Sequence, residues 1–510
     1  MTSRLTKREM KPRTFSTLGL ILLILLVLGL FAVRLMAPSN LMDKDQERPA
    51  SYVLDVLKNG HWICQTDWMG SITSKPPLYT WLSALFALLF ERFDRFTLYL
   101  PSALSVLFLA LLIRASGGKR FSPVAGFLGA LVFFLSPIST RLSVMARTDS
   151  LFTLMIVLTA LAAFRSWEKG GGWIWFWLAA AAATLTKGPL GILIGAMGLL
   201  AVFWEQRRGT PLPLRGAHLS GILVFFLLTV GWFGLAFLDM GQPVVDKMIF
   251  SELISQAVRA NREKVLEFNY LNSTIYFLHR FGPWSVVACI GLWRVFRHPA
   301  VDVSERRYER FLTCWLLGGL LVFSLAPHQR GDLVYPIIPP AALLAGREMG
   351  RWFAKFSPRA LFVAASAVSV LIFSVFTYYF LVVWTAEKLV IQTEGMRTLA
   401  GEIQKKTDKD IPLIYVDAPY TLQFFLNTMK LIVPPEEAAR QLAGTNAVYV
   451  AVCNATDFTS RLNSPVHTVA RWPETGEAFV TVFGNSLTPT LSQGERESDS
   501  PSSPFGRGPR

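Results

Sequence analysis

Long uncharged runs of hydrophobic residues dominate this sequence, in place of regular alternation between polar and apolar positions. A bilayer core of roughly 30 Å is crossed by a helix of about 20 mainly apolar residues, so a run of that size indicates a transmembrane helix. Runs of this kind predict eleven membrane spans, near residues 18–33, 99–113, 122–138, 149–164, 172–186, 188–204, 217–238, 281–296, 311–326, 333–346 and 360–384.

Basic residues between these runs predict the orientation of the chain. Lys and Arg are enriched in cytoplasmic loops, and five of them lie within residues 1–13. We therefore expect a cytoplasmic N-terminus and a first span that remains as an uncleaved anchor. One further apolar run, 76–90, is predicted to be re-entrant or interfacial, because a crossing there would place the later Arg-rich loops outside. If this run did cross, a second crossing not evident in the sequence would be needed to return the Arg-rich loops to the cytoplasmic side. The expected number of spans is therefore eleven to thirteen.

The longest polar stretches are expected on the extracytoplasmic side. They are a first outer loop at 38–98, an outer loop at 240–280, and the chain after the last span. We predict a transmembrane domain at 1–384 and a small outer α/β domain at 385–485. Residues 486–510 are rich in Ser, Pro, Gly and charge and lack apolar periodicity, so they are expected to form a disordered tail.

Short patterns support the α/β interpretation of the region after the last span. Residues 411–416 and 447–452 are β-branched or apolar runs of strand length, and 419–429 and 435–442 have helical patterning. These four segments predict two strands and two helices.

Composition excludes several classes of protein. Of the 510 residues, 52% are hydrophobic and 17% are charged, whereas soluble domains have about 25% charged residues. The chain is therefore predicted to be a polytopic α-helical membrane protein. The net charge of +15 does not indicate nucleic-acid binding, because most Lys and Arg lie in short loops between apolar runs. Four cysteines cannot frame a disulfide-rich module, and Cys64 and Cys453, both expected outside, are either free thiols or one disulfide.

Charged side chains beside the outer ends of spans are candidates for function, because charge is costly there. Asp45, Arg48 and Lys75 lie in the first outer loop. Residues Pro49 to Leu57 have the pattern of an amphipathic interfacial helix, with Asp45 near its N-terminal cap. The alternative is a solvated loop that lies on the lipid headgroups.

Asp149 and Lys187 form a second candidate group, at the ends of later spans. Asp149 opens a span and could simply cap the helix N-terminus. Lys187 lies in a Gly-Pro turn and could simply extend its charge to the interface. Two outward carboxylates beside several cations nevertheless favour chemistry, because carboxylates can deprotonate an acceptor while Lys and Arg hold a phosphate leaving group.

Further polar residues on the outer side are candidate substrate contacts. Positive charge outside runs against the orientation rule, and binding of an anionic lipid or sugar phosphate would explain it. The candidates are Arg147, Arg262, Arg280, Arg330 and Tyr335. The six histidines are scattered, and there are no paired cysteines and no H-E-x-x-H motif, which argues against a dedicated metal-binding cage. No cofactor is expected, and a divalent metal, although compatible with the carboxylates, is not indicated.

Four motifs carry a resemblance to a known family. They are Asp45-Gln46-Glu47-Arg48 leading into Gly60-His61-Trp62; Lys75-Pro76-Pro77-Leu78-Tyr79-Thr80-Trp81-Leu82; Arg95 with Leu100-Pro101-Ser102-Ala103-Leu104 and then Arg147-Thr148-Asp149; and Leu185-Thr186-Lys187-Gly188-Pro189. In this order they resemble the membrane glycosyltransferases of the C-type fold, in particular the branch of lipid A aminoarabinose transferases and dolichyl-phosphate-mannose protein mannosyltransferases. The resemblance covers roughly residues 40–345.

The resemblance implies transfer of a sugar from a polyprenyl-phosphate donor to an acceptor at the outer face of a bacterial inner membrane. It implies that Asp45 is the principal catalytic carboxylate and Asp149 its partner. Arg48, Lys75 and Lys187 match basic positions that hold the donor phosphate. The expected partners are the lipid bilayer, the polyprenyl-phosphate sugar and a glycan, lipid or protein acceptor, with no nucleic acid.

Two positions depart from the family pattern and keep alternatives open. Ser74 stands where an acidic residue often precedes Lys-Pro-Pro, and Pro49 stands where an aromatic residue is common after the Arg. A catalytically inactive relative is therefore one alternative. A transporter or flippase for a lipid-linked sugar is another, although the paired halves and broken helices typical of transporters are not evident. The sequence does not specify the sugar, or choose among lipid A, another envelope glycan or lipid, and protein as acceptor.

Overall fold

The chain divides into two compact units in the computed structural model, which describes residues 12–37, 39–206, 216–255, 270–326, 329–378, 388–462 and 464–488. The first, here called the helical unit, consists of Met1–Val33, Ser102–Gly234 and Ile249–Thr377. The second, here called the outer-loop unit, consists of Arg34–Pro101, Leu235–Met248 and Tyr378–Arg510.

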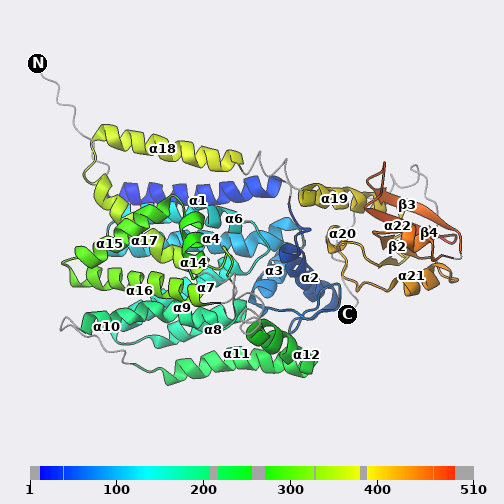
Figure 1. Cartoon of the computed structure of the whole chain (residues 1–510), viewed down its shortest axis with the longest axis horizontal. Helices are drawn as coiled ribbons and strands as arrows, with labels where there is room; N and C mark the ends of the chain where they lie inside the picture. Colours follow the sequence, from blue (N-terminus) through cyan, green and yellow to red (C-terminus); the bar gives the residue numbers. More distant parts are fainter. Residues whose placement is uncertain are drawn as a thin grey trace, which may run out of the picture. The chain divides into compact units, whose positions relative to one another are not determined.

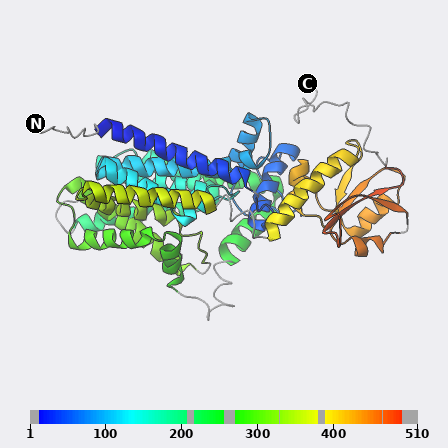
Figure 2. The same ribbon diagram turned by 90° about the horizontal axis from the view of Figure 1, so that it is seen from above.

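Apolar helices make up the helical unit, and Figures 1 and 2 show the long ones running in similar directions. Each of the eleven predicted runs coincides with helix over most of its described residues. The helices are α1 (Pro12–Met36), α4 (Arg95–Arg120), α5 (Pro123–Phe134), α6 (Pro137–Leu142), α7 (Asp149–Lys169), α8 (Trp173–Lys187), α9 (Leu190–Ala196), η1 (Met197–Leu200), α10 (Ala201–Gln206), α11 (Leu219–Met240), α14 (Asn272–Arg280), α15 (Trp284–Arg297), α16 (Val303–Leu325), η3 (Tyr335–Ile337), α17 (Ile338–Phe353) and α18 (Pro358–Thr377).

Five helices among the described residues are individually long and apolar enough to cross a membrane: α1, α4, α7, α11 and α16. The pair α14 and α15, bent by 114° at a short break, adds a sixth if it counts as one span. Several other predicted spans coincide with shorter apolar helices. A polytopic helical membrane protein is thereby confirmed, while the number of eleven to thirteen crossings stays a prediction.

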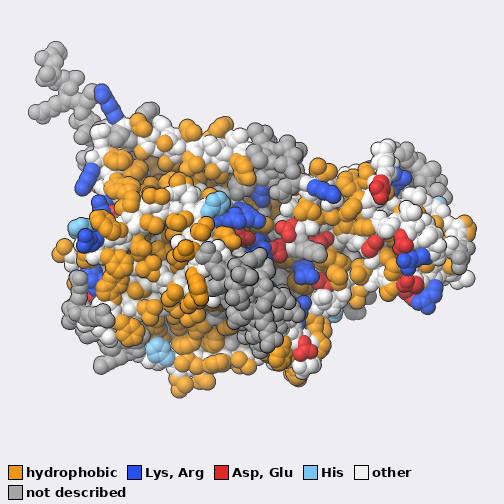
Figure 3. All heavy atoms as spheres, in the orientation of Figure 1, with side chains coloured by type: hydrophobic (Ala, Val, Ile, Leu, Met, Phe, Trp, Pro, Cys, Tyr) orange, Lys and Arg blue, Asp and Glu red, His pale blue; other side chains and the backbone are white. Residues whose placement is uncertain are grey.

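Burial separates the inner helices of this unit from the outer ones. In the apolar window of α7, 72% of the residues are buried inside the protein, compared with 17% for α11. Large side chains of α11 such as Leu223, Leu227 and Leu238 are exposed. Figure 3 shows a largely hydrophobic face over the helices. Such a surface suits contact with lipid tails rather than water.

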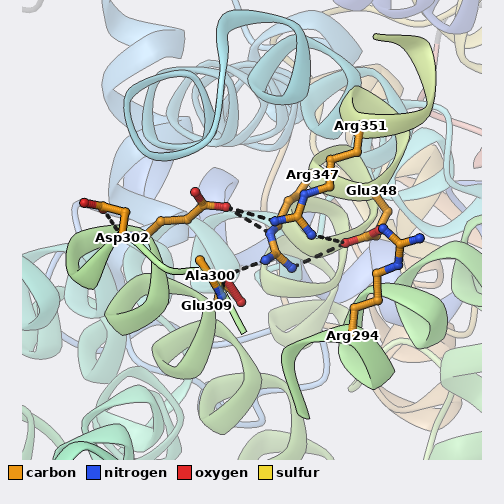
Figure 4. Close-up of polar contacts among 8 residues, drawn as sticks. Arg294, Ala300, Asp302, Glu309, Arg347, Glu348 and Arg351 are labelled. Atoms are coloured by element: carbon orange, nitrogen blue, oxygen red, sulfur yellow. Dashed lines mark hydrogen bonds and ion pairs between the residues drawn. The ribbon is translucent and has the colours of Figure 1, made fainter. Parts of the chain in front are cut away.

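Ion pairs join α15, α16 and α17 at the end of the unit where α15 ends and α16 begins (Figure 4). This set, here called the balanced network, pairs three arginines with three glutamates: Arg294, Arg347 and Arg351 with Glu305, Glu309 and Glu348. Arg347 Nη2 lies 2.5 Å from Glu309 Oε1, and both side chains are almost fully buried. The loop arginines predicted to orient the chain thus include residues that lie inside helices and hold them together.

The outer-loop unit combines the first outer loop with the C-terminal region. Its own elements are α2 (Lys44–Asn59), α3 (Leu78–Leu89), α12 (Gln242–Val245), α19 (Lys388–Lys406), β1 (Leu413–Tyr415), α20 (Tyr420–Leu426), α21 (Pro435–Leu442), β2 (Tyr449–Val452), α22 (Ala455–Thr459), β3 (Val466–Trp472) and β4 (Val480–Asn485), and η2 (Asp246–Ser255) begins in it. The sheet has the order β1-β2-β4-β3, with β1 parallel to β2 and the other pairs antiparallel.

The four predicted C-terminal segments coincide with β1, β2, α20 and α21, so the small α/β region is confirmed. Strands β3 and β4 and helix α19 were not predicted. The boundary between residues 384 and 385 stays a prediction, as does the disordered tail, whose residues from 489 onward lie outside the described part of the chain.

Polar and aromatic contacts join the C-terminal region to the first outer loop within this unit. Glu47 of α2 accepts hydrogen bonds from the backbone N and the Oγ1 of Thr421, at 3.1 and 3.3 Å. The ring of Tyr420 stacks on Trp68, with centroids 5.0 Å apart. Ile432 N donates to Trp68 O at 3.0 Å. The α/β region therefore supports the loop that carries Asp45.

Helix α2 begins earlier than the predicted Pro49–Leu57 segment, because Asp43 caps it: the Asp43 side chain accepts a hydrogen bond from Asp45 N at 3.0 Å. Asp45 is the second residue of the helix, near the cap as predicted. The cysteines follow the free-thiol alternative, since Cys64 and Cys453 are both unpaired. Burial raises the pKa of the Cys64 thiol to about 12.

We expect Gly346→Leu to destabilise the helical unit. A Cβ at Gly346 would lie 2.5 Å from both Ala125 O and Gly129 N, so α17 approaches the backbone of α5 too closely for a side chain. Such overpacking costs on the order of 1–3 kcal/mol. Thermal unfolding in detergent should show a lower midpoint. Gly231→Leu is the control, because nothing lies within 4 Å of a Cβ there. Equal effects of the two substitutions would contradict the close α5–α17 contact.

Candidate active site

Asp149 lies at the start of α7 and pairs with two cations of the helical unit. Its Oδ1 is 2.5 Å from Lys187 Nζ at the end of α8, and its Oδ2 is 3.1 Å from Arg147 Nε. The N-cap residue, Thr148, makes no side-chain capping bond. Asp149 is therefore more than a helix cap, and Lys187 is held by a carboxylate rather than extended into the interface.

Asp332 extends this group from a distant part of the sequence. Arg147 Nη1 donates to Asp332 Oδ2 at 2.8 Å, so the guanidinium of Arg147 bridges two carboxylates. Arg141 Nη1 lies 3.6 Å from Asp332 Oδ1. Asp332 is buried, and the sequence did not single it out as a site residue. We call Asp149, Lys187, Arg147, Asp332 and Arg141 the Asp149 cluster.

Three other predicted residues lie close to this cluster. Arg330 is near enough to act electrostatically on Asp149, and Asp149 is near enough to act electrostatically on Tyr335. The guanidinium of Arg280 lies against Gly331, where an added Cβ would be 2.8 Å from Arg280 Nε. Tyr335 is fully buried and its ring stacks on Phe133. Their contacts with a substrate stay predictions, and the predicted Arg262 lies outside the described residues.

The positive charges of the Asp149 cluster outnumber its negative ones. Lys187, Arg147 and Arg141 carry three positive charges against the two of Asp149 and Asp332, before Arg330 and Arg280 are counted. Apart from Arg141, these side chains are mostly buried. A group of fixed cations in a poorly solvated place favours an anion such as a phosphate.

The other predicted residues lie in the outer-loop unit. Arg48 Nε on α2 is 3.6 Å from Asp67 Oδ2, while half of the Arg48 side chain is exposed. Asp67 is fully buried and accepts hydrogen bonds from the backbone N of Met69 and of Ser71. Lys75 follows this turn and is partly buried. Asp67 thus fixes the turn at residues 67–71, which lies between Arg48 and Lys75 in the sequence. Asp67 was not among the predicted site residues.

A second buried carboxylate, Asp55, fixes the same loop. Asp55 accepts hydrogen bonds from Thr66 N at 2.8 Å and Asn59 Nδ2 at 2.7 Å, and it lies 3.1 Å from His61 Nδ1. Trp81 Nε1 of α3 donates to Trp62 O at 2.6 Å. The motif Gly60-His61-Trp62 therefore positions the loop against α2 and α3. Asp45 itself is partly exposed at the beginning of α2.

A cavity of about 340 Å³ lies in the outer-loop unit, at the end of α1 and the start of α4. Its lining combines aromatic rings with two arginines and comes from the first outer loop and from α19 and α20 of the C-terminal region: Leu35, Phe93, Asp94, Arg95, Phe96, Arg397, Phe424, Phe425 and Asn427. Asp94 accepts hydrogen bonds from the backbone N of Phe96 and Thr97, so its charge is used to cap α4. In the described ranges, no group of three or more His, Cys, Asp or Glu residues is arranged to hold a metal ion.

Sequence comparison finds relatives among sugar transferases. The family model of dolichyl-phosphate-mannose-protein mannosyltransferases matches residues 74–233. One relative is the undecaprenyl phosphate-alpha-4-amino-4-deoxy-L-arabinose arabinosyl transferase of Erwinia tasmaniensis, to which the chain is 24% identical over 312 residues. The match covers 60% of this chain and 54% of that protein. The chain is 25% identical over 337 residues to the transferase of the same name from Enterobacter sp. strain 638, covering 63% and 57%. The matches thus span just over half the length of these relatives.

Structural comparison identifies the fold. The crystal structure of ArnT from Cupriavidus metallidurans, bound to undecaprenyl phosphate, superposes with a TM-score of 0.68 at 17% identity, covering 92% of this chain and 98% of that one. This chain therefore has the C-type membrane glycosyltransferase fold with a small C-terminal sheet region, and the resemblance indicated by the four motifs is confirmed.

We expect Asp149→Asn to destabilise the protein because it leaves the cations Lys187 and Arg147 partly uncompensated. Breaking a buried pair by removing one partner costs about 3–5 kcal/mol. The double variant Asp149→Asn/Lys187→Met should regain part of this loss, since one stranded cation is gone. Thermal unfolding midpoints in detergent test both, with the exposed Asp410→Asn as control. If the losses of stability caused by Asp149→Asn alone and Lys187→Met alone simply add in the double variant, the Asp149–Lys187 pair is contradicted.

Proposed function

We propose that this membrane glycosyltransferase moves a sugar from a polyprenyl-phosphate carrier to an acceptor at the outer face of a bacterial inner membrane. The observation that carries the proposal is the Asp149 cluster, a buried group with surplus positive charge whose residues Arg147-Thr148-Asp149 and Lys187 belong to the family motifs. The names of the relatives suggest undecaprenyl-phosphate aminoarabinose as the first donor to test.

Lys187 has the geometry of a phosphate-holding group in this proposal. One N–H of its ammonium donates to Asp149, and no other hydrogen bond of this ammonium joins it to the described part of the chain, which leaves two N–H groups for phosphate oxygens. Arg147 keeps its orientation through Asp149 and Asp332. Fixed cations stabilise the charge that develops on a departing phosphate without needing to reorient. Arg48 and Lys75, on the loop fixed by Asp67, are proposed to contact the same phosphate.

Asp45 is the proposed general base. The acceptor hydroxyl would give its proton to the Asp45 carboxylate while its oxygen attacks the anomeric carbon. The bond from that carbon to the phosphate oxygen breaks, and the electron pair leaves with the polyprenyl phosphate. A single displacement of this kind inverts the anomeric configuration. Asp149 is proposed to assist by holding Lys187 and Arg147 in place.

The cavity of the outer-loop unit is the proposed acceptor-binding site. Phenylalanine rings and the Arg95 and Arg397 guanidiniums line it, which suits an amphiphile with an apolar part and an anionic group. Arg95 also donates to Leu35 O and Ala37 O, so it links the cavity wall to the end of the first predicted span. We propose a lipid acceptor that carries phosphate or carboxylate.

Asp45→Asn should reduce sugar transfer by about 10²- to 10⁴-fold, the usual contribution of a general base. Binding of undecaprenyl phosphate should persist, because the cations remain. The assay follows, by mass spectrometry, transfer from undecaprenyl-phosphate aminoarabinose to envelope lipids in reconstituted vesicles. Asp410→Asn, which removes an exposed charge elsewhere, is the control. Unchanged transfer would remove Asp45 from the mechanism, and donor movement without any transfer by the unaltered protein would favour a flippase.

Arg397→Gln should raise the KM for an anionic lipid acceptor several-fold and leave kcat unchanged, because the exposed Arg397 contributes charge at the cavity but is not placed at the reacting atoms. Lys409→Gln removes one exposed positive charge from the same region, away from the cavity, and should leave KM unchanged. Equal effects of the two variants would show that only overall charge matters.

A further inference from the structure

Three arginines of α16 converge on one buried glutamate of α10. Arg306, Arg307 and Arg310 are spaced so that they share one side of the helix. Arg310 Nη1 donates to Glu205 Oε1, while Arg306 Nη2 and Arg307 Nε lie 3.6 and 4.0 Å from Glu205 Oε2. The Glu205 carboxylate is fully buried. We call these four residues the Glu205 cluster.

Charge distinguishes the Glu205 cluster from the balanced network on the other side of the same helix. The balanced network pairs three arginines with three glutamates, whereas the Glu205 cluster sets three arginines around one glutamate. Arg306 and Arg307 are only 15% and 18% exposed, and Arg310 is buried. Cations removed from water in this way are favourable only with compensating negative charge.

The Nε atom of one arginine indicates where a ligand could form an additional hydrogen bond. Arg306 Nε is buried and has no hydrogen-bond partner in the part of the chain that the structure describes. An acceptor oxygen placed between Arg306 and Arg307 would satisfy it and reduce the positive surplus at the same time. A phosphate presents several such oxygens and matches the fork of arginine N–H groups.

The surroundings of the cluster are apolar and exposed, as expected at a lipid-facing surface. The Arg310 guanidinium lies over the ring of Trp204, 5.0 Å from its centroid. Trp204 stacks on Phe296 at 5.1 Å. Phe296 and Phe203 are 53% and 63% exposed. Aromatic rings beside arginines at the end of a predicted span are typical of the headgroup region.

We propose that the Glu205 cluster binds the phosphate of an anionic phospholipid, with its acyl chains along Phe203 and Phe296. The lipid is favoured over free phosphate as the source of the anion because the aromatic surface adjoins the cations. Basic pockets between transmembrane helices bind anionic headgroups in this manner. The site lies in α10 and α16, apart from the Asp149 cluster, and the proposal is independent of the proposed sugar transfer.

Native mass spectrometry and thermal unfolding of the purified full chain test this proposal with three probes: phosphatidylglycerol, phosphatidylcholine and inorganic phosphate. We expect one phosphatidylglycerol to be retained about 10-fold or more tightly than phosphatidylcholine, and to raise the unfolding midpoint. Arg306→Gln/Arg307→Gln should abolish this preference, and Arg306→Lys/Arg307→Lys should keep most of it because the charge remains.

The control is Arg297→Gln/Lys355→Gln, which removes two exposed positive charges from the same unit and should leave the preference intact. If the double glutamine variant does not fold, Arg306→Gln alone, which removes the buried Nε described above, should reduce the preference by several-fold. Equal retention of the two lipids by the unaltered protein would overturn the proposal. So would stabilisation by inorganic phosphate equal to that by phosphatidylglycerol, or an equal loss in the control variant.

Discussion

Charge inside an apolar helix bundle is stable only when it is paired, and this constraint explains how the helical unit is built. Asp149 begins the most buried of the long helices, and its carboxylate meets Lys187 and Arg147 at ion-pair distance. The same pairing joins α15, α16 and α17 through the balanced network. Each pair adds a polar link between helices that also pack through apolar contacts and close glycine approaches. Paired charge therefore contributes to joining these helix ends.

Helix α16 shows how one short sequence meets this constraint in two ways. The relevant segment is Glu305-Arg306-Arg307-Tyr308-Glu309-Arg310. Its two glutamates are four residues apart and face α17, where both form ion pairs with Arg347. Arg306 and Arg310 are also four residues apart and face Glu205 of α10. Among the ion pairs of the described residues, the first face has as many arginines as glutamates, and the second has three arginines to one glutamate. A single helix thus supplies both a structural clamp and a candidate site for an anion.

The fold could be predicted from the sequence to the extent that the bilayer constrains it. Apolar runs indicated the helices because a membrane core requires them, and Asp149, Arg147 and Lys187 were identified because charge at a span end is costly. Asp332 and Asp67 resemble ordinary loop acids and Asp55 an ordinary acid of a helix, and the roles of all three depend on tertiary contacts. Asp332 meets Arg147 across 185 positions of sequence. Strand β3 mixes polar with apolar residues and is only partly buried in the sheet. Strand β4 is fully buried, and its run from Phe479 to Phe483 is apolar or β-branched, so that strand was missed although the sequence carries the pattern.

The central claim is that Asp45 and the Asp149 cluster act on one polyprenyl phosphate. An experimental structure of the full chain in a lipid nanodisc with bound undecaprenyl phosphate tests it most directly. The account predicts phosphate density within ion-pair distance of Lys187, with the Asp45 carboxylate facing the sugar that this phosphate carries. Phosphate bound away from Lys187, or Asp45 and Asp149 on opposite sides of the bilayer, would contradict it.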